Sequence, residues 1–238
     1  EGMEAMTSKR LGRQTVRLGS PVSVLSYANI GGKQEAQGPL AGYFDELNQD
    51  AYFGQKSWEK GESAMQQFAL RRAMEKGGLI PEDLDYVLAG DLLNQCIGSS
   101  FSLRNRGVPT LGLYGACSTM AESLLLAAMS VSGGFARTAL AMTSSHFASS
   151  ERQYRFPLGY GGQRTPTSQW TVTGAGAVLL GGGERGIRIT AATIGSIVDR
   201  GICDANNMGA AMAPAAFATL RAHFDDLHCT PEDYDVII

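Results

Sequence analysis

The amino-acid sequence predicts an α/β fold with a largely parallel sheet, and three observations support this prediction. Helix-like and strand-like segments alternate along the chain from Val22 onward, as they do in α/β proteins. Glycine accounts for 30 of the 238 residues, and its clusters separate these segments without forming a low-complexity tract. The segment Pro81–Leu88 recurs as Pro231–Ile238, 150 residues further along the chain, which indicates a duplicated unit.

The elements are predicted in order from their periodicity and from the glycines that bound them. Glu59–Lys76 carries apolar side chains at helical spacing and is followed by Gly77 and Gly78, so a helix is expected there. Ser118–Val131 is predicted as a long apolar helix. Strands are predicted at Leu84–Ala89, Thr110–Tyr114, Thr138–Ser144, Gly174–Leu180 and Arg188–Ile194, the last two as an antiparallel pair.

The repeat divides the chain into a first half, residues 1–183, and an incomplete second half, residues 184–238. The alternative is that two helix-to-strand turns share the same turn chemistry. Because the second copy stops within the strand that corresponds to Tyr86–Leu88, the chain is expected to be a truncated product or a fragment. Apolar surface and an unpaired strand edge would then be exposed, and self-association is expected.

Composition and charge exclude several classes of protein. Lys plus Arg is 20 and Asp plus Glu is 23, a net charge of -3 without a basic block, so nucleic acid is not an expected partner. The four cysteines form no C-x-x-C pair, and neither a disulfide framework nor a metal site is expected. The longest apolar run, Leu124–Met129, is too short to cross a bilayer, and no signal peptide is recognised. The chain is therefore expected to be intracellular and not secreted.

One cysteine lies in a context that points to chemistry or ligand binding. A predicted strand leads through Gly115-Ala116 to Cys117, and a helix follows directly. At a helix N-terminus the free backbone N–H groups and the helix dipole favour a thiolate and stabilise a developing oxyanion. The pattern indicates a nucleophile elbow or a ligand-facing turn. The alternative is a small buried cysteine at the end of a strand.

The residues around this cysteine carry a family resemblance. Gly115–Ser118 and Thr173–Leu180 resemble the thiolase and 3-oxoacyl-ACP synthase superfamily, whose duplicated αβαβα fold agrees with the internal repeat. A narrower resemblance, to the stage V sporulation protein AD family, covers essentially the whole chain. The resemblance implies a thiolase-like duplicated αβαβα fold with a truncated second half. The narrower resemblance is carried by Gly38–Leu40, Tyr43–Asp45, Gly90–Gln95, Leu113–Met120, Thr143–Phe147, Glu151–Arg155 and Gln169–Gly174.

The resemblance also implies a function. It implies a non-enzymatic protein that binds dipicolinic acid, as the free acid or the calcium chelate, for its uptake into the developing spore. Membrane proteins of the same sporulation operon are the implied partners. The implied location is peripheral, on the cytoplasmic face of the spore or forespore membrane. No cofactor is implied, and calcium enters only as part of the ligand.

An acyltransferase of the 3-oxoacyl-ACP synthase type, with Cys117 as the nucleophile, is the alternative. A structural subunit with a vestigial pocket is a third. A condensing enzyme needs a His with an Asn, or two His, to move protons and polarise the thioester. In the superfamily these residues come from the second half, which this chain mostly lacks. The Gly-Asp-Gly-Ala-Gly string of the superfamily is also altered, because Thr173 precedes Gly174-Ala175-Gly176 and no acidic residue is present there. These departures favour binding, so no catalytic residue is assigned.

The predicted ligand-binding residues are Cys117, Ser118, His146, Arg152 and Arg155. Dipicolinate is a planar dianion, which guanidinium groups and a protonated imidazole pair through charge-assisted hydrogen bonds, and on which aromatic rings stack. The alternatives are a polar residue at a strand end for His146 and solvated loop arginines for the other two.

A homodimer is expected to form through the strand Thr138–Thr143, whose continuous apolar run suits a strand buried on both faces. The alternative is an interior strand of a monomer. Asp91, at the end of another predicted strand, is either part of the ligand site or a helix cap.

Overall fold

The computed structural model of the protein describes residues 9–150, 171–184, 186–204 and 207–237. The chain divides into two compact units, which are described separately below. The larger unit is Val22–Arg188, and the smaller unit combines Glu1–Pro21 with Ile189–Ile238.

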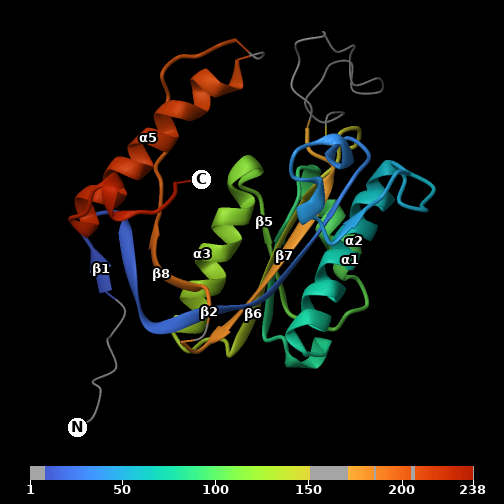
Figure 1. Ribbon diagram of the computed structural model, residues 1–238, viewed down its shortest axis with the longest axis horizontal. Coiled ribbons are helices and arrows are strands. Elements are labelled where there is room, and N and C mark those ends of the chain that lie inside the picture. Colours follow the sequence, from blue (N-terminus) through green and yellow to red (C-terminus); the bar gives the residue numbers. More distant parts are fainter. Residues whose placement is uncertain (1–8, 151–170, 185, 205–206, 238) are drawn as a thin grey trace. The chain divides into compact units, whose positions relative to one another are not determined.

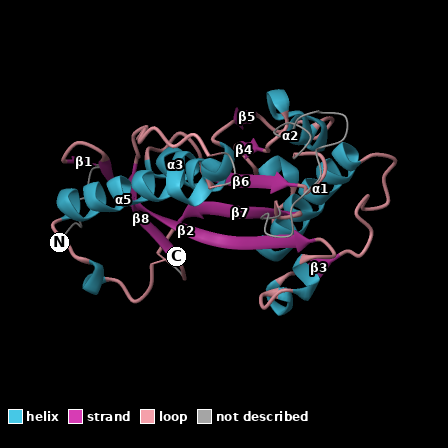
Figure 2. Cartoon of the chain, turned by 90° about the horizontal axis from the view of Figure 1, so that it is seen from above, coloured by secondary structure: helices cyan, strands magenta, loops and turns pink. Residues whose placement is uncertain are grey.

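A five-stranded mixed sheet forms the centre of the larger unit (Figure 2). Parallel pairing joins β4 to both β5 and β6, while β7 lies antiparallel between β6 and β2. The prediction of a largely parallel sheet therefore needs correction: two of these four pairings are parallel and two are antiparallel, because β7 runs opposite to both of its neighbours. The strand order is β2 (Thr15–Gly31), β7 (Gly174–Gly182), β6 (Thr138–Ser145), β4 (Tyr86–Gly90) and β5 (Thr110–Leu113), with the two-residue strand β3 (Glu46–Leu47) paired to the end of β2.

Helices cover both faces of this sheet. Figure 1 shows α1 (Trp58–Gly77) and α2 (Ile97–Leu103) on one face and α3 (Thr119–Ser132) on the other. The Ser57 side chain caps the start of α1 by accepting a hydrogen bond from the Lys60 amide, and Gly78 ends the helix in a left-handed conformation. The core lies between α1 and the sheet, where apolar side chains of both pack, among them Met65, Ala69, Leu70, Leu140, Met142 and Leu179.

The smaller unit contains the second copy of the repeated segment. β1 (Lys9–Leu11) pairs antiparallel with the first residues of β2, and β8 (Arg188–Thr193) also pairs with β2. α5 (Met208–Leu227) is joined to the β1–β2 turn by Asp226, whose carboxylate accepts hydrogen bonds from the amides of three consecutive residues beginning at Arg13.

The repeat predicted from the sequence is present in the structure. α1 and α5 each have 20 residues and start 150 positions apart. Each is followed by a left-handed residue, Gly78 or His228, and then by a Pro-Glu-Asp 3-10 turn. The carboxylate of Asp83 in one turn and of Asp233 in the other accepts the same backbone amide, three residues upstream.

Three further predictions about strands need correction. β2 is the longest strand and was not predicted, because its basic start and Pro21 hide its alternation. β7 and β8 do not pair with each other, since both pair with β2. The predicted dimer strand is β6, but β4 and β7 occupy both of its edges, so it cannot pair with a second chain. Its apolar run marks an interior strand, and the open edge of the sheet belongs to β5.

Candidate functional site

The carboxyl ends of three parallel strands meet at one edge of the larger unit. Gly90, the last residue of β4, is in register with Leu113 of β5 and Thr143 of β6. A Cβ at Gly90 would lie 2.2 Å from the carbonyl oxygen of Leu113 and 2.5 Å from a methyl carbon of Thr119, so only glycine allows this approach. The segments that follow the three strands therefore lie close together, where ligands bind in open α/β sheets.

Cys117 lies on the tight turn between β5 and α3, and its side chain is exposed. Ala116, directly before it, has a φ of 49°, a left-handed conformation that a residue with a Cβ rarely adopts. Thr119 holds the turn by accepting a hydrogen bond from the Gly115 amide (3.1 Å) and donating one to the Ala116 carbonyl (2.9 Å). The predicted elbow is therefore present, and the alternative of a buried strand-end cysteine is wrong.

The neighbouring segment after β4 has the same kind of backbone. Gln95 and Cys96 are consecutive left-handed residues, with φ of 61° and 50°. The Cys96 thiol donates a hydrogen bond to the Leu113 carbonyl (3.1 Å), which ties this segment to the elbow. Burial, with the nearby negative charge of Asp91, raises the pKa of the Cys96 thiol, so it stays protonated. Such strained residues cluster where a protein positions groups for function.

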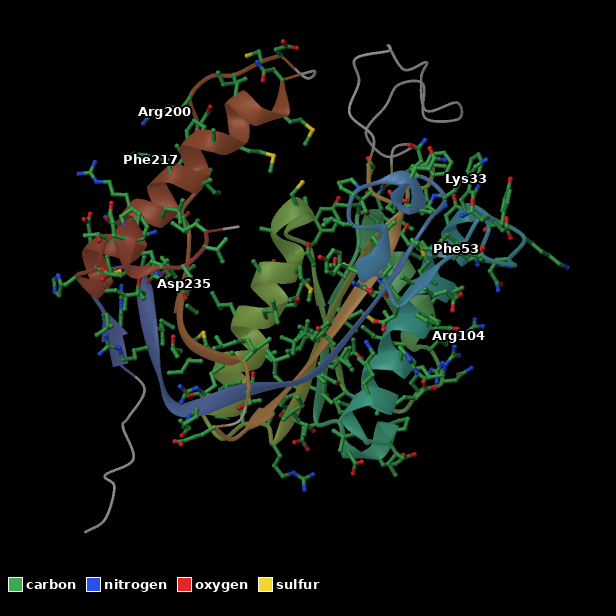
Figure 3. All side chains as sticks on the ribbon, viewed as in Figure 1. Lys33, Phe53, Arg104, Arg200, Phe217 and Asp235 are labelled. Atoms are coloured by element: carbon green, nitrogen blue, oxygen red, sulfur yellow. The ribbon has the colours of Figure 1, made fainter. Side chains whose placement is uncertain are left out.

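His146 follows β6 and is fully buried, at 0% exposure. Its Nε2 bonds the Ala51 carbonyl (2.8 Å), while Nδ1 accepts from the amides of Ala148 (3.1 Å) and Ser149 (3.4 Å). Phe53 packs edge-on against the ring (labelled in Figure 3). Burial lowers the pKa of the imidazole. The prediction of a protonated His146 facing a ligand is therefore wrong, because a neutral ring with both nitrogens occupied shapes the turn instead.

A buried carboxyl group lies beside this turn. Glu62 of α1 is at 0% exposure, and it accepts hydrogen bonds from the hydroxyls of Ser144 (2.9 Å) and Ser149 (2.6 Å). Burial is the main cause that raises its pKa to about 7, and the negative charge of Asp91 adds to the shift. Within the described residues, no ion pair joins Glu62 to a cation, and with this pKa the group changes between its protonated and ionised forms near neutral pH.

Gln66 extends the polar cluster across the end of β4. Its amide nitrogen is 2.8 Å from the Ser144 hydroxyl, 3.1 Å from the Ser99 hydroxyl and 3.2 Å from the Gly90 carbonyl. Its amide oxygen accepts from the Ser102 hydroxyl (2.7 Å). The side chain therefore joins α1, α2 and the ends of two strands below the elbow.

Asp91 acts as a cap, one of the two roles that the sequence left open. Its carboxylate is at 1% exposure and accepts from the amides of Leu93 (2.9 Å) and Ser99 (2.7 Å) and from the Ser99 hydroxyl (2.6 Å). It fixes the loop between β4 and α2 and has no remaining role as an exposed ligand contact.

Of the predicted site residues, the structure brings Cys117 and Ser118 together on the elbow, both with exposed side chains. The Ser118 hydroxyl donates to the Gly115 carbonyl (2.8 Å). Arg152 and Arg155 lie outside the described residues. Sequence reasoning missed Glu62 and Gln66. Their signal was present, because both continue the buried stripe of Ala69 and Ala73 at helical spacing, where polar residues are unexpected.

In the part of the chain that the structure describes, no group of three or more His, Cys, Asp or Glu side chains is arranged to hold a metal ion. None of the described helices combines the length and the apolar character that a membrane crossing requires.

The sheet with helices on both faces, the repeat and the elbow define a thiolase-like fold, the fold of the 3-oxoacyl-ACP synthases. A solved structure of a cerulenin-bound OleA variant from Xanthomonas campestris matches 90% of this chain and 73% of that chain, with a TM-score of 0.60 and 16% identity. The chain spans only 52% of the priming β-ketosynthase of the R1128 polyketide pathway, and 74% of this chain is matched there at 17% identity and a TM-score of 0.45.

The particular family follows from the sequence comparisons. The model of the family described as Stage V sporulation protein AD (SpoVAD) matches residues 12–238. The Stage V sporulation protein AD of Bacillus subtilis (strain 168) is 44% identical over 230 residues, which cover 97% of this chain and 68% of that protein. The chain belongs to the stage V sporulation protein AD family, which confirms the resemblance and supports a role in sporulation.

Proposed function

We propose that this protein binds dipicolinic acid, free or as its calcium chelate, for uptake into the developing spore. The observation that carries the proposal is the exposed elbow of Cys117 and Ser118 at the start of α3. The Ser118 side chain makes no capping hydrogen bond to α3. The amides of Ser118 and Thr119 bond the Gly115 and Ala116 carbonyls, so the amides available to a ligand are those of the next two residues, which have no side-chain cap. A carboxylate placed there would accept these N–H groups and interact favourably with the helix dipole.

Binding without catalysis is supported by the surroundings of the thiol. Among the described residues, the Cys117 thiol has no hydrogen-bonded base. His146, which follows the adjacent part of the sheet, has both ring nitrogens engaged with backbone groups. A thiol nucleophile is normally activated by an adjacent base or by a lowered pKa. We therefore favour binding over the acyltransferase alternative, and the two differ in whether an acyl-Cys117 intermediate forms.

Titration calorimetry with dipicolinate, with and without calcium, tests the proposal. Ser118→Asp should keep α3 intact, because Asp is a good N-terminal cap, but it places a negative charge where we expect the ligand carboxylate. Two like charges about 4 Å apart repel by about 4 kcal/mol at a surface-like dielectric, so the affinity should fall at least tenfold. Ser118→Asn has nearly the same shape without the charge and measures the steric part of the change.

A change at an exposed thiol elsewhere supplies a further control. Cys117→Trp should block the elbow sterically, whereas Cys203→Ala alters an exposed cysteine of the smaller unit and should leave binding intact. Binding by neither wild type nor Cys203→Ala would overturn the proposed function. Equal binding by Ser118→Asp and wild type would overturn the site. Trapping of an acyl group on Cys117 from an acyl thioester would favour the acyltransferase.

We also propose that the protein acts with membrane proteins of the same sporulation operon, as a peripheral protein on the cytoplasmic face of the spore or forespore membrane. Family membership supports this placement. Co-sedimentation of the purified protein with vesicles that contain those membrane proteins, and its absence from vesicles of lipid alone, would distinguish a protein partner from a lipid partner.

A homodimer across the open edge of β5 replaces the one expected at β6. Among the described strands, only β4 pairs with β5, and exposed apolar side chains surround the free edge. Phe101, Leu111 and Tyr114 are 51%, 53% and 52% exposed. Such an edge favours pairing with another strand. Sedimentation of Leu111→Lys should show a monomer where wild type dimerises, and Leu25→Lys, on β2, serves as the control.

A further inference from the structure

The turn that follows β6, residues 146–150, joins two buried ionisable side chains through one serine. The Ser149 amide donates to Nδ1 of His146 (3.4 Å), and the Ser149 hydroxyl donates to Oε2 of Glu62 (2.6 Å). We propose that this turn is a proton-operated conformational device, which neutral Glu62 and neutral His146 hold closed and which loosens when either group becomes charged. The inference concerns the protein without ligand and does not depend on the proposed function.

The first half of the device is the Glu62 carboxyl. Its two serine partners donate hydrogen bonds, but no cation neutralises it among the described residues. The charged groups that act on it, Glu59 of the same helix and Asp91 after β4, are both acidic. The elements that also pack here, α2 and β7, contain no ionisable residue. An ionised Glu62 would therefore be a buried negative charge beside another one, a state that burial strongly disfavours.

The second half is His146. Two backbone amides, of Ala148 and Ser149, point at Nδ1, which can accept them only when it carries no proton. Protonation would place an N–H against two N–H groups and break the turn. The carboxylates of Glu59 and Glu35 act on this ring and favour the cation, but burial outweighs them and lowers the imidazole pKa.

Glu62 and His146 change the stability of the closed turn in opposite directions as the pH rises. The folded-state pKa of Glu62 is raised from 4.5 to about 7, so its favourable contribution to the closed turn is lost as pH rises through about 7. The folded-state pKa of His146 is lowered from 6.5, so its contribution is lost as pH falls through that lower value. The closed turn is therefore most stable in mildly acidic solution and loosens on either side.

Trp58 reports on this turn. Its ring lies 6.4 Å from the His146 ring and 6.3 Å from the Phe147 ring, measured between centroids. With Trp170→Phe as background, Trp58 is the only tryptophan in the chain. The experiment follows Trp58 fluorescence from pH 5 to 8.5, together with hydrogen exchange of the 147–150 amides. We expect an alkaline transition in Trp58 fluorescence with a midpoint near pH 7. Beyond the intrinsic increase, exchange should become faster by up to about tenfold per pH unit as the pH approaches this midpoint from below, and this additional effect should level off above it.

Three variants test whether ionisation of Glu62 causes the alkaline transition. Glu62→Gln, which resembles the protonated carboxyl, should abolish the alkaline transition. Ser149→Ala keeps the carboxyl but removes one donor to the ionised form, so its midpoint should move to higher pH. Glu75→Gln makes the same chemical change at an exposed position of α1 and should leave the midpoint unchanged. An unaltered midpoint in Glu62→Gln or Ser149→Ala would overturn the proposal, as would a wild type without a transition between pH 6 and 8.

Discussion

The two copies of the repeated helix, α1 and α5, have the same length and the same C-terminal turn, but they differ in how many of their side chains are buried. α1 buries nine residues, including Glu62 and Gln66. The described side chains of α5 include none that is buried. Met212 and Ala216 stand at the repeat positions of Glu62 and Gln66, and both are exposed. Phe217, labelled in Figure 3, is 66% exposed.

The difference shows that the two copies share backbone structure but not buried polar side chains. The shared features are the helix length, the left-handed end and the acidic turn, all of which depend on a few local residues. Among the described residues, the buried polar cluster belongs to the first copy alone. A buried polar group is costly unless it is fully hydrogen-bonded, so this cluster is the clearest difference between the two copies.

The largest effect is expected from removing the centre of the polar cluster. Gln66→Ala would remove the buried hydrogen bonds that the Gln66 side chain makes to the Gly90 carbonyl and to three serine hydroxyls, and should lower the free energy of unfolding by about 4 kcal/mol. Ala216→Gln, the reverse change at the matching position of α5, should alter it by less than about 0.5 kcal/mol. Urea unfolding measures both, and equal effects would contradict the contrast between the copies.

A slightly smaller effect is expected at the repeated leucine. Leu70 is 4% exposed within the core, and its counterpart Leu220 is 39% exposed. Leu70→Ala should cost about 3 kcal/mol through lost burial and a residual cavity, and Leu220→Ala less than about 1 kcal/mol. Thermal unfolding compares the two. If Leu220→Ala costs as much as Leu70→Ala, α5 is covered in solution by another surface.

The pH dependence of stability should also separate the copies, because only α1 has a buried acid at this position. With the pKa of Glu62 raised from 4.5 to about 7 in the folded state, the free energy of unfolding should fall by up to about 3 kcal/mol as pH rises across that range. His146 contributes an opposite slope below pH 6.5. The difference between wild type and Glu62→Gln isolates the first effect, and parallel stability curves would refute it.

The sequence was sufficient for elements that depend on local patterns. The helices over Glu59–Lys76 and Ser118–Val131 were placed within a residue of α1 and α3, and the elbow at Cys117 followed from Gly115-Ala116. Strand partners were not predictable in the same way, because periodicity identifies a strand but not its neighbour. β6 is the clear case: its apolar run was correct evidence of burial but not of a dimer interface.

The candidate site was less predictable for a related reason. The role of His146 depends on amides that converge on Nδ1 only in the folded turn, which no sequence pattern encodes. Glu62 and Gln66 were visible as polar residues on an apolar stripe. Their roles depend on hydrogen bonds to Ser144, Ser149 and other residues that are distant in the sequence. These roles could therefore be recognised only in the structure.

The smallest effect is expected at the aspartate that ends the repeated turn. In the first copy, the Asp85 carboxylate accepts hydrogen bonds from the backbone amides of Arg137 (2.6 Å) and Thr138 (3.2 Å) and joins the turn to the start of β6. These bonds, of which the Arg137 amide is the strongest cause, lower the pKa of Asp85. The counterpart Asp235 is exposed and has no hydrogen bond among the described residues.

Asp85→Asn should therefore cost about 1 kcal/mol, a modest value because the group is partly exposed, and Asp235→Asn should cost almost nothing. Because the pKa of Asp85 is lowered in the folded state, its contribution is present at neutral pH and is lost as pH falls below 3.8 through the folded-state value. Urea unfolding of both variants at pH 7 measures the difference, and it should disappear in acid. A loss at Asp235 equal to that at Asp85 would mean that the second turn also holds a strand, and the two copies would then differ only in their helices.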